Sequence, residues 1–337
     1  MREMQMLLVD VRSPAEYEQG HIPGAISVPL LSNDERAVVG TAYKQQSRQA
    51  AIDAALRYVA PRMEQIVASV QAFADGRPVQ VYCWRGGMRS ASVTWLLRDA
   101  GIASEQMPGG YKAYRRDVLT MLEQPWKMIV VGGRTGSGKT QVLQALRARG
   151  QQVLDLEALA HHKGSSFGAL QQPPQPSSEH MANLMATELS TMDPQRTLFV
   201  EDESLRIGTV VLHKPWYDAM QNAPVVVLDV ERSERASFLA DDYGDAVLPD
   251  LIAAFQRIER RIGGLRLQRA LTAINLGNLA DAATQALEYY DATYDYAIER
   301  RAPHQLHRIE ATGLTIDQRA AAIEQAIVAS RWDRYAE

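Results

Sequence analysis

The stretch Val79–Ser90 reads VQVYCWRGGMRS and decides the fold of the N-terminal part of the chain. Its first four residues are typical of a buried strand, and the pattern from Ser92 to Leu97 predicts a helix. The loop between them carries Cys83, the only cysteine in 337 residues. A strand that ends in a glycine-rich turn before a helix points several backbone N–H groups at one spot. We therefore expect an anion-binding loop around the sulfur.

This loop predicts a reactive thiolate. A helix N-terminus and nearby arginines lower the pKa of a thiol, and the thiolate is the nucleophile. A small buried cysteine beside an ordinary turn is the alternative, but it gives no reason for two glycines and two arginines. We expect Cys83 to be the catalytic nucleophile, inside an oxyanion loop made of Trp84, Arg85, Gly86, Gly87, Met88, Arg89 and Ser90.

Four motifs in order resemble a rhodanese domain, over roughly the N-terminal third of the chain. They are LVDVRSPAEY at 8–17, GHIPGA at 20–25, the Cys83 loop and PGGY at 108–111. Rhodaneses carry a sulfane sulfur on the loop cysteine. The spacing from Cys83 to Arg89 is C-x5-R, as in protein tyrosine and dual-specificity phosphatases, and a loop of this length has room for a tetrahedral oxyanion. A phosphatase therefore remains an alternative, although Tyr82 stands where tyrosine phosphatases usually carry a histidine.

A second decisive stretch, GRTGSGKT at 133–140, fits G-x-x-x-x-G-K-[ST] between the apolar run 127–131 and the helical pattern 142–146. Glycines let backbone N–H groups point at phosphate oxygens, the lysine adds positive charge, and the threonine hydroxyl suits phosphate or Mg²⁺. The motif does not say which phosphorylated ligand binds. We expect a phosphate or diphosphate to bind at Gly133, Arg134, Thr135, Gly136, Ser137, Gly138, Lys139 and Thr140, with any Mg²⁺ at Thr140.

Strand and helix patterns alternate from Lys127 to Arg235, which predicts a parallel sheet covered by helices. Phosphates then bind at the carboxyl ends of its strands. One apolar strand ends in three acids, Glu201, Asp202 and Glu203, and so resembles a Walker B element that holds Mg²⁺. A solvated strand end is the alternative.

Two polar segments are candidates for ligand contact. The segment HHKGSSFG is predicted to be a loop that binds substrate; an ordinary polar loop is the alternative. The candidate substrate contacts are His161, His162, Lys163, Ser165 and Ser166.

The segment 256–269 carries five arginines and one acid. We expect Arg257 and Arg261 to share a helical face, and the glycines at 263 and 264 to break or bend the helix. One interpretation is a solvated helix. The other is a surface that contacts the phosphate backbone of a nucleic acid, made of Arg257, Arg260, Arg261, Arg266 and Arg269.

Composition limits the classes of protein. Apolar residues make up 46% and charged residues 23%, as in globular proteins, and the net charge of −4 excludes a globally basic nucleic-acid binder but not a local basic surface. One cysteine excludes an internal disulfide and a cysteine-rich zinc site. No apolar stretch has the length of a membrane span, and residues 1–4 lack a signal-peptide core. We expect a cytoplasmic protein, with a shortened N-terminus because a strand already begins at Met6.

The chain is predicted to have three parts. These are a rhodanese-like α/β domain over 1–122, a P-loop NTPase-like parallel α/β domain over 123–240, and a helical C-terminal region over 241–337. Joined in one chain, and with the strings CWRGGMRS, GGRTGSGKT and HHKGSSFG, they resemble the bacterial tRNA 2-selenouridine synthase family essentially throughout.

This resemblance implies replacement of sulfur by selenium at wobble 2-thiouridine, position 34 of tRNA, with selenophosphate as donor. It also implies an S-geranylated intermediate made from geranyl diphosphate, with Cys83 carrying the selenium and the P-loop holding the diphosphate. The implied partners are tRNA and a selenophosphate-producing enzyme, with no membrane and no tightly bound cofactor. From the motifs alone, a rhodanese-fused NTPase that regulates or carries sulfur remains an alternative.

Overall fold

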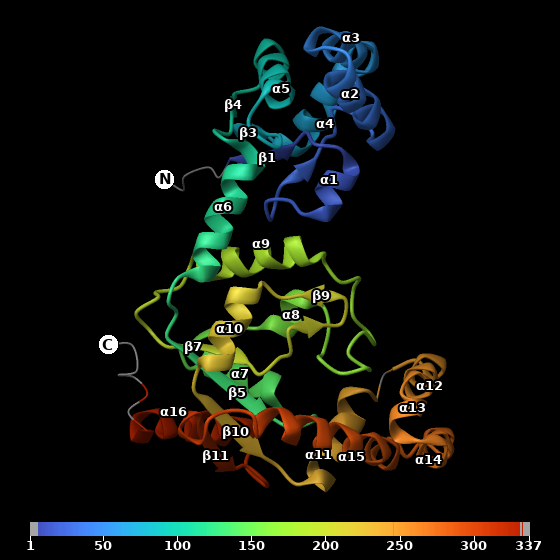
Figure 1. Cartoon of the computed structure of the whole chain (residues 1–337), viewed down its shortest axis with the longest axis vertical. Coiled ribbons are helices and arrows are strands. Elements are labelled where there is room, and N and C mark those ends of the chain that lie inside the picture. The colour runs from blue at the N-terminus through green and yellow to red at the C-terminus, as the bar shows by residue number, and fades with distance from the viewer. Residues whose placement is uncertain (1–5, 245, 331, 333–337) are drawn as a thin grey trace. The chain divides into compact units, whose positions relative to one another are not determined.

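The computed structural model describes residues 6–244, 246–330 and 332, so residues 1–4, on which the signal-peptide prediction rests, lie outside it. The chain divides into two compact units, 1–121 with 182–187, and 122–181 with 188–337 (Figure 1). Within the described ranges, no helix has both the length and the apolar composition that crossing a membrane needs.

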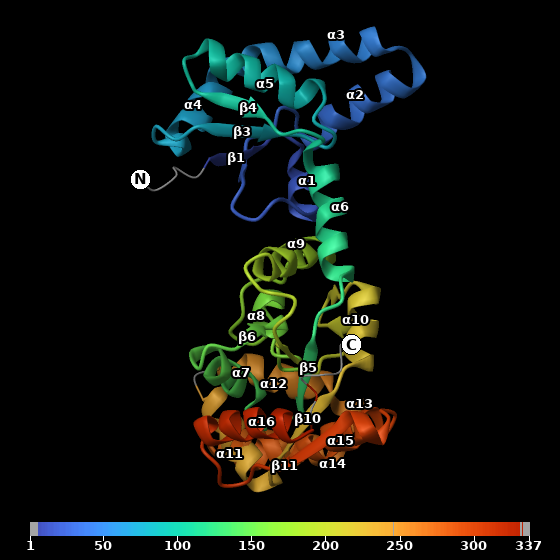
Figure 2. The same ribbon diagram turned by 90° about the vertical axis from the view of Figure 1, so that its left-hand side faces the viewer.

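The first unit is built on a parallel sheet with the strand order β2-β1-β3-β4 (Figure 2). Its strands are β1 (Leu7–Asp10), β2 (Ile26–Ser27), β3 (Val79–Tyr82) and β4 (Ser104–Gln106). Its helices are α1 (Pro14–Gln19), α2 (Asn33–Gln45), α3 (Arg48–Val59), α4 (Met63–Ala74), α5 (Met88–Asp99) and most of α6 (Gly110–Glu123). This is the α/β domain that the sequence predicted.

The buried Arg12 joins three of the sequence motifs in this unit. It lies 2.6 Å from Asp10 of its own motif, donates to the carbonyl oxygen of Gly20 (2.6 Å), and stacks 3.8 Å from the centre of the Tyr111 ring. Its contacts therefore hold the segments at 8–17, 20–25 and 108–111 together at the end of the sheet that carries Cys83.

The second unit holds five parallel strands in the order β11-β10-β5-β7-β6. They are β5 (Met128–Gly133), β6 (Gln152–Leu154), β7 (Leu198–Glu201), β10 (Val225–Asp229) and β11 (Leu306–Glu310), and a separate hairpin pairs β8 (Arg206–Ile207) with β9 (Val210–Val211). The helices are α7 (Lys139–Ala148), α8 (Leu156–Ala160), α9 (Ser178–Leu189, partly in the first unit), α10 (Lys214–Asn222), α11 (Arg232–Asp242), α12 (Leu248–Arg257), α13 (Glu259–Ile262), α14 (Gly264–Asn275), α15 (Leu279–Ile298) and α16 (Ile316–Ser330).

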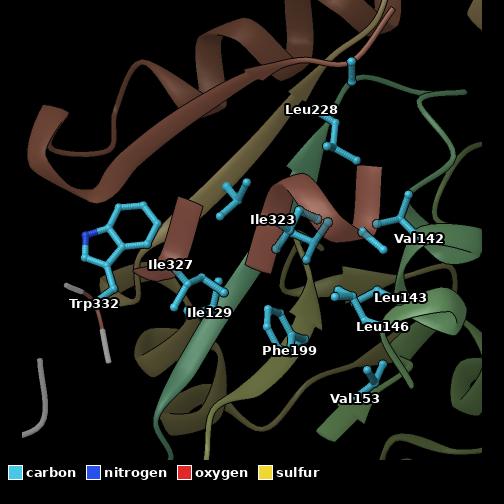
Figure 3. Packing of buried hydrophobic residues seen from close by; sticks show 14 of the residues in the cluster. Ile129, Val142, Leu143, Leu146, Val153, Phe199, Leu228, Ile323, Ile327 and Trp332 are labelled. Carbon is cyan, nitrogen blue, oxygen red and sulfur yellow. The ribbon is translucent and has the colours of Figure 1, made fainter. Parts of the chain in front are cut away.

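The sheet of this unit packs against α7 and α16. Figure 3 shows Leu143 and Leu146 of α7 and Ile323 of α16 meeting Phe199 of the sheet. A second buried cluster joins α12 to α15 and includes Phe167 from the predicted substrate loop. The P-loop strand β5 lies between β7 and β10, so the loop at 133–140 opens at the middle of the sheet edge, where ligands of open α/β sheets bind.

Two details differ from the sequence prediction. The strand β11 lies within the region predicted to be helical, and it was missed because the segment LHRIE has no buried residue and sits at the sheet edge. The predicted common helical face of Arg257 and Arg261 is interrupted, because α12 ends at Arg257 and α13 starts at Glu259. The predicted break at Gly263 is confirmed, with φ at +84° between α13 and α14.

Candidate functional site

The thiol of Cys83 lies at the carboxyl end of β3, in front of the first turn of α5. It is 3% exposed. Its Sγ lies 3.1 Å from the Ser90 hydroxyl and accepts a bond from the Gly87 N–H at 3.3 Å. The Gln106 amide donates to the Ser90 hydroxyl oxygen at 2.8 Å and to the Gly87 carbonyl at 3.0 Å. The single proton of the Ser90 hydroxyl has two acceptors within reach, the Cys83 sulfur at 3.1 Å and the Gly87 carbonyl oxygen at 3.2 Å, and a thiolate at Cys83 would be the charged one of the two.

The pKa of Cys83 is lowered. Burial on its own disfavours the thiolate, but bonds from Ser90 and the Gly87 N–H and the charge of Arg89 outweigh burial. The loop therefore favours the thiolate, which is the reactive form of a cysteine.

The two loop arginines differ in their surroundings. Arg89 forms an ion pair with the Glu16 carboxylate, 2.8 Å away. Burial on its own would raise the pKa of Glu16, but the bond from Arg89 outweighs burial and the pKa of Glu16 is lowered. Arg85 is exposed and makes no hydrogen bond or ion pair with the described residues. Trp84 and Met88 are also exposed, so these three side chains border the loop and face the solvent.

The PGGY motif packs directly on the thiol loop. Gly110 has φ of +57°, and a Cβ there would lie 2.3 Å from the carbonyl oxygen of Cys83 and 2.5 Å from the amide nitrogen of Gly86. The N–H of Tyr111 donates to the same Cys83 carbonyl at 2.9 Å. A side chain at position 110 would displace the loop, so this glycine is required for its shape.

We expect Ser90→Ala to slow alkylation of Cys83 by iodoacetamide at pH 7 by about threefold to tenfold, because a bond to the charged form is lost. The midpoint of the pH–rate profile should move to higher pH. Ser92→Ala is the matched control, since the Ser92 hydroxyl bonds only to the Arg89 carbonyl in the same helix. An unchanged midpoint in Ser90→Ala would contradict the assignment.

The P-loop is held in shape by arginines from α11 and α16. Arg235 donates to the carbonyl oxygen of Thr135 at 3.1 Å, and Arg319 donates to that of Ser137 at 3.0 Å. Both arginines are buried, at 2% and 4% exposed. Buried guanidinium groups thus occupy the loop carbonyls, which suits a loop whose N–H groups face an anion.

A pocket of about 560 Å³ opens over this loop and is lined by seven of the eight predicted phosphate-binding residues. The exception is Arg134, whose guanidinium makes two bonds of 2.9 Å to Asp295 and does not line the pocket. Lys139 donates to the Gly133 carbonyl at 2.8 Å. That contact leaves the lysine at the pocket wall, where a phosphate would meet its charge.

Three carboxyl groups gather beside Thr140. Its hydroxyl lies 3.0 Å from Glu201 and 3.0 Å from Glu157, and the Glu157 N–H donates to Glu201 at 3.1 Å. Burial, followed by the neighbouring carboxylates, raises the pKa of Glu201 and of Glu203 well above the usual range. The Thr140 hydroxyl can donate its one proton to only one of the two carboxyl groups at a time, and burial raises the pKa of Glu157 as well.

The structure separates the three candidate Walker B acids. Glu201 contacts Thr140, and Glu203 lines the pocket. Asp202 also lines the pocket, but its carboxylate pairs with buried Arg301 at 2.7 Å, and Arg301 also donates to the carbonyl of Met220. Glu157 was not singled out in the sequence, because no motif marks it.

No group of three or more histidine, cysteine or acidic side chains in the described ranges is arranged to hold a metal ion by itself. Mg²⁺ is usually bound by one or two carboxylates together with substrate phosphates. The Thr140 hydroxyl with Glu201 and Glu157 fits that requirement.

The HHKGSSFG loop contributes to the same pocket through three of its five predicted residues. Lys163, Ser165 and Ser166 line the pocket, and Lys163 pairs with Asp242 at 2.8 Å. The histidines do not line it. His161 bonds to the Pro174 carbonyl at 2.9 Å, and His162 is buried, which lowers its pKa.

The five candidate tRNA arginines fall into two groups. Arg257 and Arg261 reach Ser166 at 3.4 and 3.3 Å, and Arg261 also lines the pocket. Arg266 pairs with Glu288 at 2.7 Å. Within the part of the chain that the structure describes, only the remaining two of the five have no hydrogen bond or ion pair; these exposed residues are Arg260 and Arg269.

The fold and the two loops define a class of enzyme in which a rhodanese-like domain with a thiolate is joined to a P-loop domain. Residues 1–117 match the family described as the rhodanese-like domain, and 126–316 match the tRNA 2-selenouridine synthase AAA domain. The chain belongs to the tRNA 2-selenouridine synthase family.

Relatives that carry this name cover most of the chain. The protein from Shewanella denitrificans is 34% identical over 333 residues, covering 87% of this chain and 89% of that protein. The protein from Pseudomonas fluorescens is 34% identical over 341 residues, covering 91% of both. The protein from Aeromonas salmonicida is 40% identical over 245 residues, covering 70% of this chain and 64% of that protein.

Proposed function

We propose that this chain replaces the 2-sulfur of wobble thiouridine in tRNA by selenium, with selenophosphate as the donor. Family membership along both units supports the overall reaction. The observation that carries the site assignment is the thiol of Cys83, bonded by Ser90 and the Gly87 N–H in a loop of oxyanion size. On this proposal, the Cys83 thiolate attacks the phosphorus of selenophosphate, so an S–P bond forms, the P–Se bond breaks and selenide is released at the loop. Water then cleaves the S–P bond and frees phosphate.

We propose that the P-loop pocket binds geranyl diphosphate. The thiouridine sulfur attacks C1 of the geranyl group, so a C–S bond forms, the C–O bond breaks and diphosphate leaves. Selenide released from selenophosphate then adds at C2 of the base, a C–Se bond forms, the C–S bond breaks, and the geranylthiolate leaves and takes up a proton. Lys139 and the loop N–H groups would hold the diphosphate. Any Mg²⁺ would lie at Thr140 and Glu201, where it would offset the charge of the diphosphate.

We further propose that the protein acts in the cytoplasm, where tRNA is found, and that it takes its donor from a selenophosphate-producing enzyme. Activity with chemically prepared selenophosphate, in the absence of such an enzyme, would show that direct docking between the two is not required.

Cys83→Ala should abolish selenouridine formation and leave tRNA binding and geranyl transfer largely intact, since the diphosphate pocket lies in the other unit. Mass spectrometry of nucleosides from tRNA incubated with selenophosphate and geranyl diphosphate measures both products. Selenouridine at the level of the parent protein in this variant would refute the assignment.

Lys139→Ala should weaken binding of geranyl diphosphate by about 2–4 kcal/mol, because a charge-assisted bond to phosphate is lost. Geranylation at limiting geranyl diphosphate should fall, and selenation with it. Lys214→Ala is the control, as this exposed lysine pairs with Asp218 on α10. Normal geranylation by Lys139→Ala, with loss of ATP turnover instead, would support the nucleotide-dependent alternative.

Arg260 and Arg269 are the best remaining candidates for tRNA contact, because the other three arginines of the segment are bonded within the protein. Changing both to Gln should make the slope of log affinity against log salt concentration less steep. The slope should change by about 0.7–0.9 for each tRNA phosphate that is no longer neutralised. Arg116→Gln is the control, because this exposed arginine lies outside the segment and pairs with Asp117 on α6. An unchanged slope in the folded double variant would place the tRNA surface elsewhere.

A further inference from the structure

A small apolar cavity lies beside the P-loop pocket, within the second unit. Its volume is about 50 Å³. Apart from Thr135, Ser165 and two tyrosine hydroxyls, its lining is hydrocarbon. The lining residues are Thr135, Ser165, Phe167, Leu239, Tyr243, Leu251, Phe255, Leu279, Ala282, Ala283, Ala286, Leu287 and Tyr290.

The cavity adjoins the phosphate pocket, because five residues line both: Thr135, Ser165, Leu239, Tyr243 and Tyr290. The two tyrosines form a boundary between polar and apolar space. The Tyr290 hydroxyl accepts a bond from the Ser166 N–H at 3.3 Å, and Lys163 lies 5.0 Å from the centre of the Tyr243 ring. The Tyr290 hydroxyl is thus bonded to the HHKGSSFG loop, Lys163 of the same loop lies over the Tyr243 ring, and both tyrosines line the cavity.

One face of α15 forms a wall of the cavity. The lining positions 279, 282, 283, 286, 287 and 290 recur at helical spacing, and three of them are alanines. The opposite wall includes Phe167 and Phe255, whose rings pack edge to face with centroids 4.8 Å apart. Larger side chains at the alanine positions would fill the space that the aromatic pair leaves open.

We propose that this cavity receives the far end of the hydrocarbon chain of a prenyl diphosphate whose head lies on the P-loop, and thereby sets the chain length that the enzyme accepts. The proposal rests on the proposed binding of a diphosphate in the larger pocket. An apolar space next to a phosphate-binding loop fits a ligand with a charged head and an aliphatic tail.

The volume of the cavity determines which part of the prenyl hydrocarbon chain can enter it. A cavity that holds benzene measures about 150 Å³, so 50 Å³ accommodates only the last few carbons of a chain. The first isoprene unit would then lie in the larger pocket, beside the tyrosines. A five-carbon chain would stop short of the cavity, and a fifteen-carbon chain would exceed it.

The test compares ligands that share one head group. Calorimetry would measure binding of inorganic diphosphate and of dimethylallyl, geranyl and farnesyl diphosphate to the full chain. We expect geranyl diphosphate to bind about 10- to 100-fold more tightly than dimethylallyl diphosphate, as burial of two to four carbons implies. Ala286→Leu should abolish that gain and leave binding of inorganic diphosphate unchanged. Ala292→Leu, at an exposed position on α15 outside both pockets, is the matched control.

Two further variants keep the proposal testable if Ala286→Leu does not fold. Ala283→Val narrows the cavity from a half-buried position. Leu251→Ala enlarges the cavity and should strengthen binding of farnesyl diphosphate relative to that of geranyl diphosphate. The tail proposal fails if inorganic diphosphate binds but chain length has no effect, or if the folded cavity variants keep the preference of the parent. If neither inorganic diphosphate nor any prenyl diphosphate binds the parent protein, the proposed function of the P-loop itself fails.

Discussion

Arg235, in the first turn of α11, is buried and makes two bonds to Asp291 of α15, at 2.8 and 2.9 Å. The same guanidinium donates to the carbonyl oxygens of Thr135 and Val230. The P-loop, the end of β10 and the long helix α15 are therefore joined through one side chain. Removing one partner of such a buried pair costs about 3–5 kcal/mol, because the other charge remains buried.

This arrangement explains why residues far apart in the sequence form one pocket. A second pair, Arg134 with Asp295, repeats the link one turn further along α15. Tyr290 and the alanine face lie on the same helix, so the polar and apolar parts of the pocket are positioned by the contacts that shape the phosphate loop. The phosphate loop and α15 are thus held by shared ion pairs.

The sequence predicted the parts of both sites that are formed by consecutive residues of the chain. A strand, a glycine-rich loop and a helix follow one another directly in the chain, so the Cys83 loop and the P-loop were both identifiable. Glu157, Gln106 and Glu16 were not, because each reaches its loop from a separate element. Glu157 and Gln106 lie outside the motifs, and the motif at 8–17, which contains Glu16, says nothing of a contact with the Cys83 loop. The role of Glu201 among three adjacent acids likewise depended on which one faces Thr140, and only the folded structure gives that.

The single cysteine has a consequence for redox chemistry. A sulfenic acid at a reactive thiolate is usually rescued by condensation with a nearby resolving thiol. This chain has no second cysteine, so Cys83 cannot form an internal disulfide. Its small exposure limits access by oxidants, and a sulfenic acid that forms there can be returned to the thiol only through a thiol from another molecule. The enzyme therefore depends on the reducing capacity of its surroundings to keep its nucleophile active.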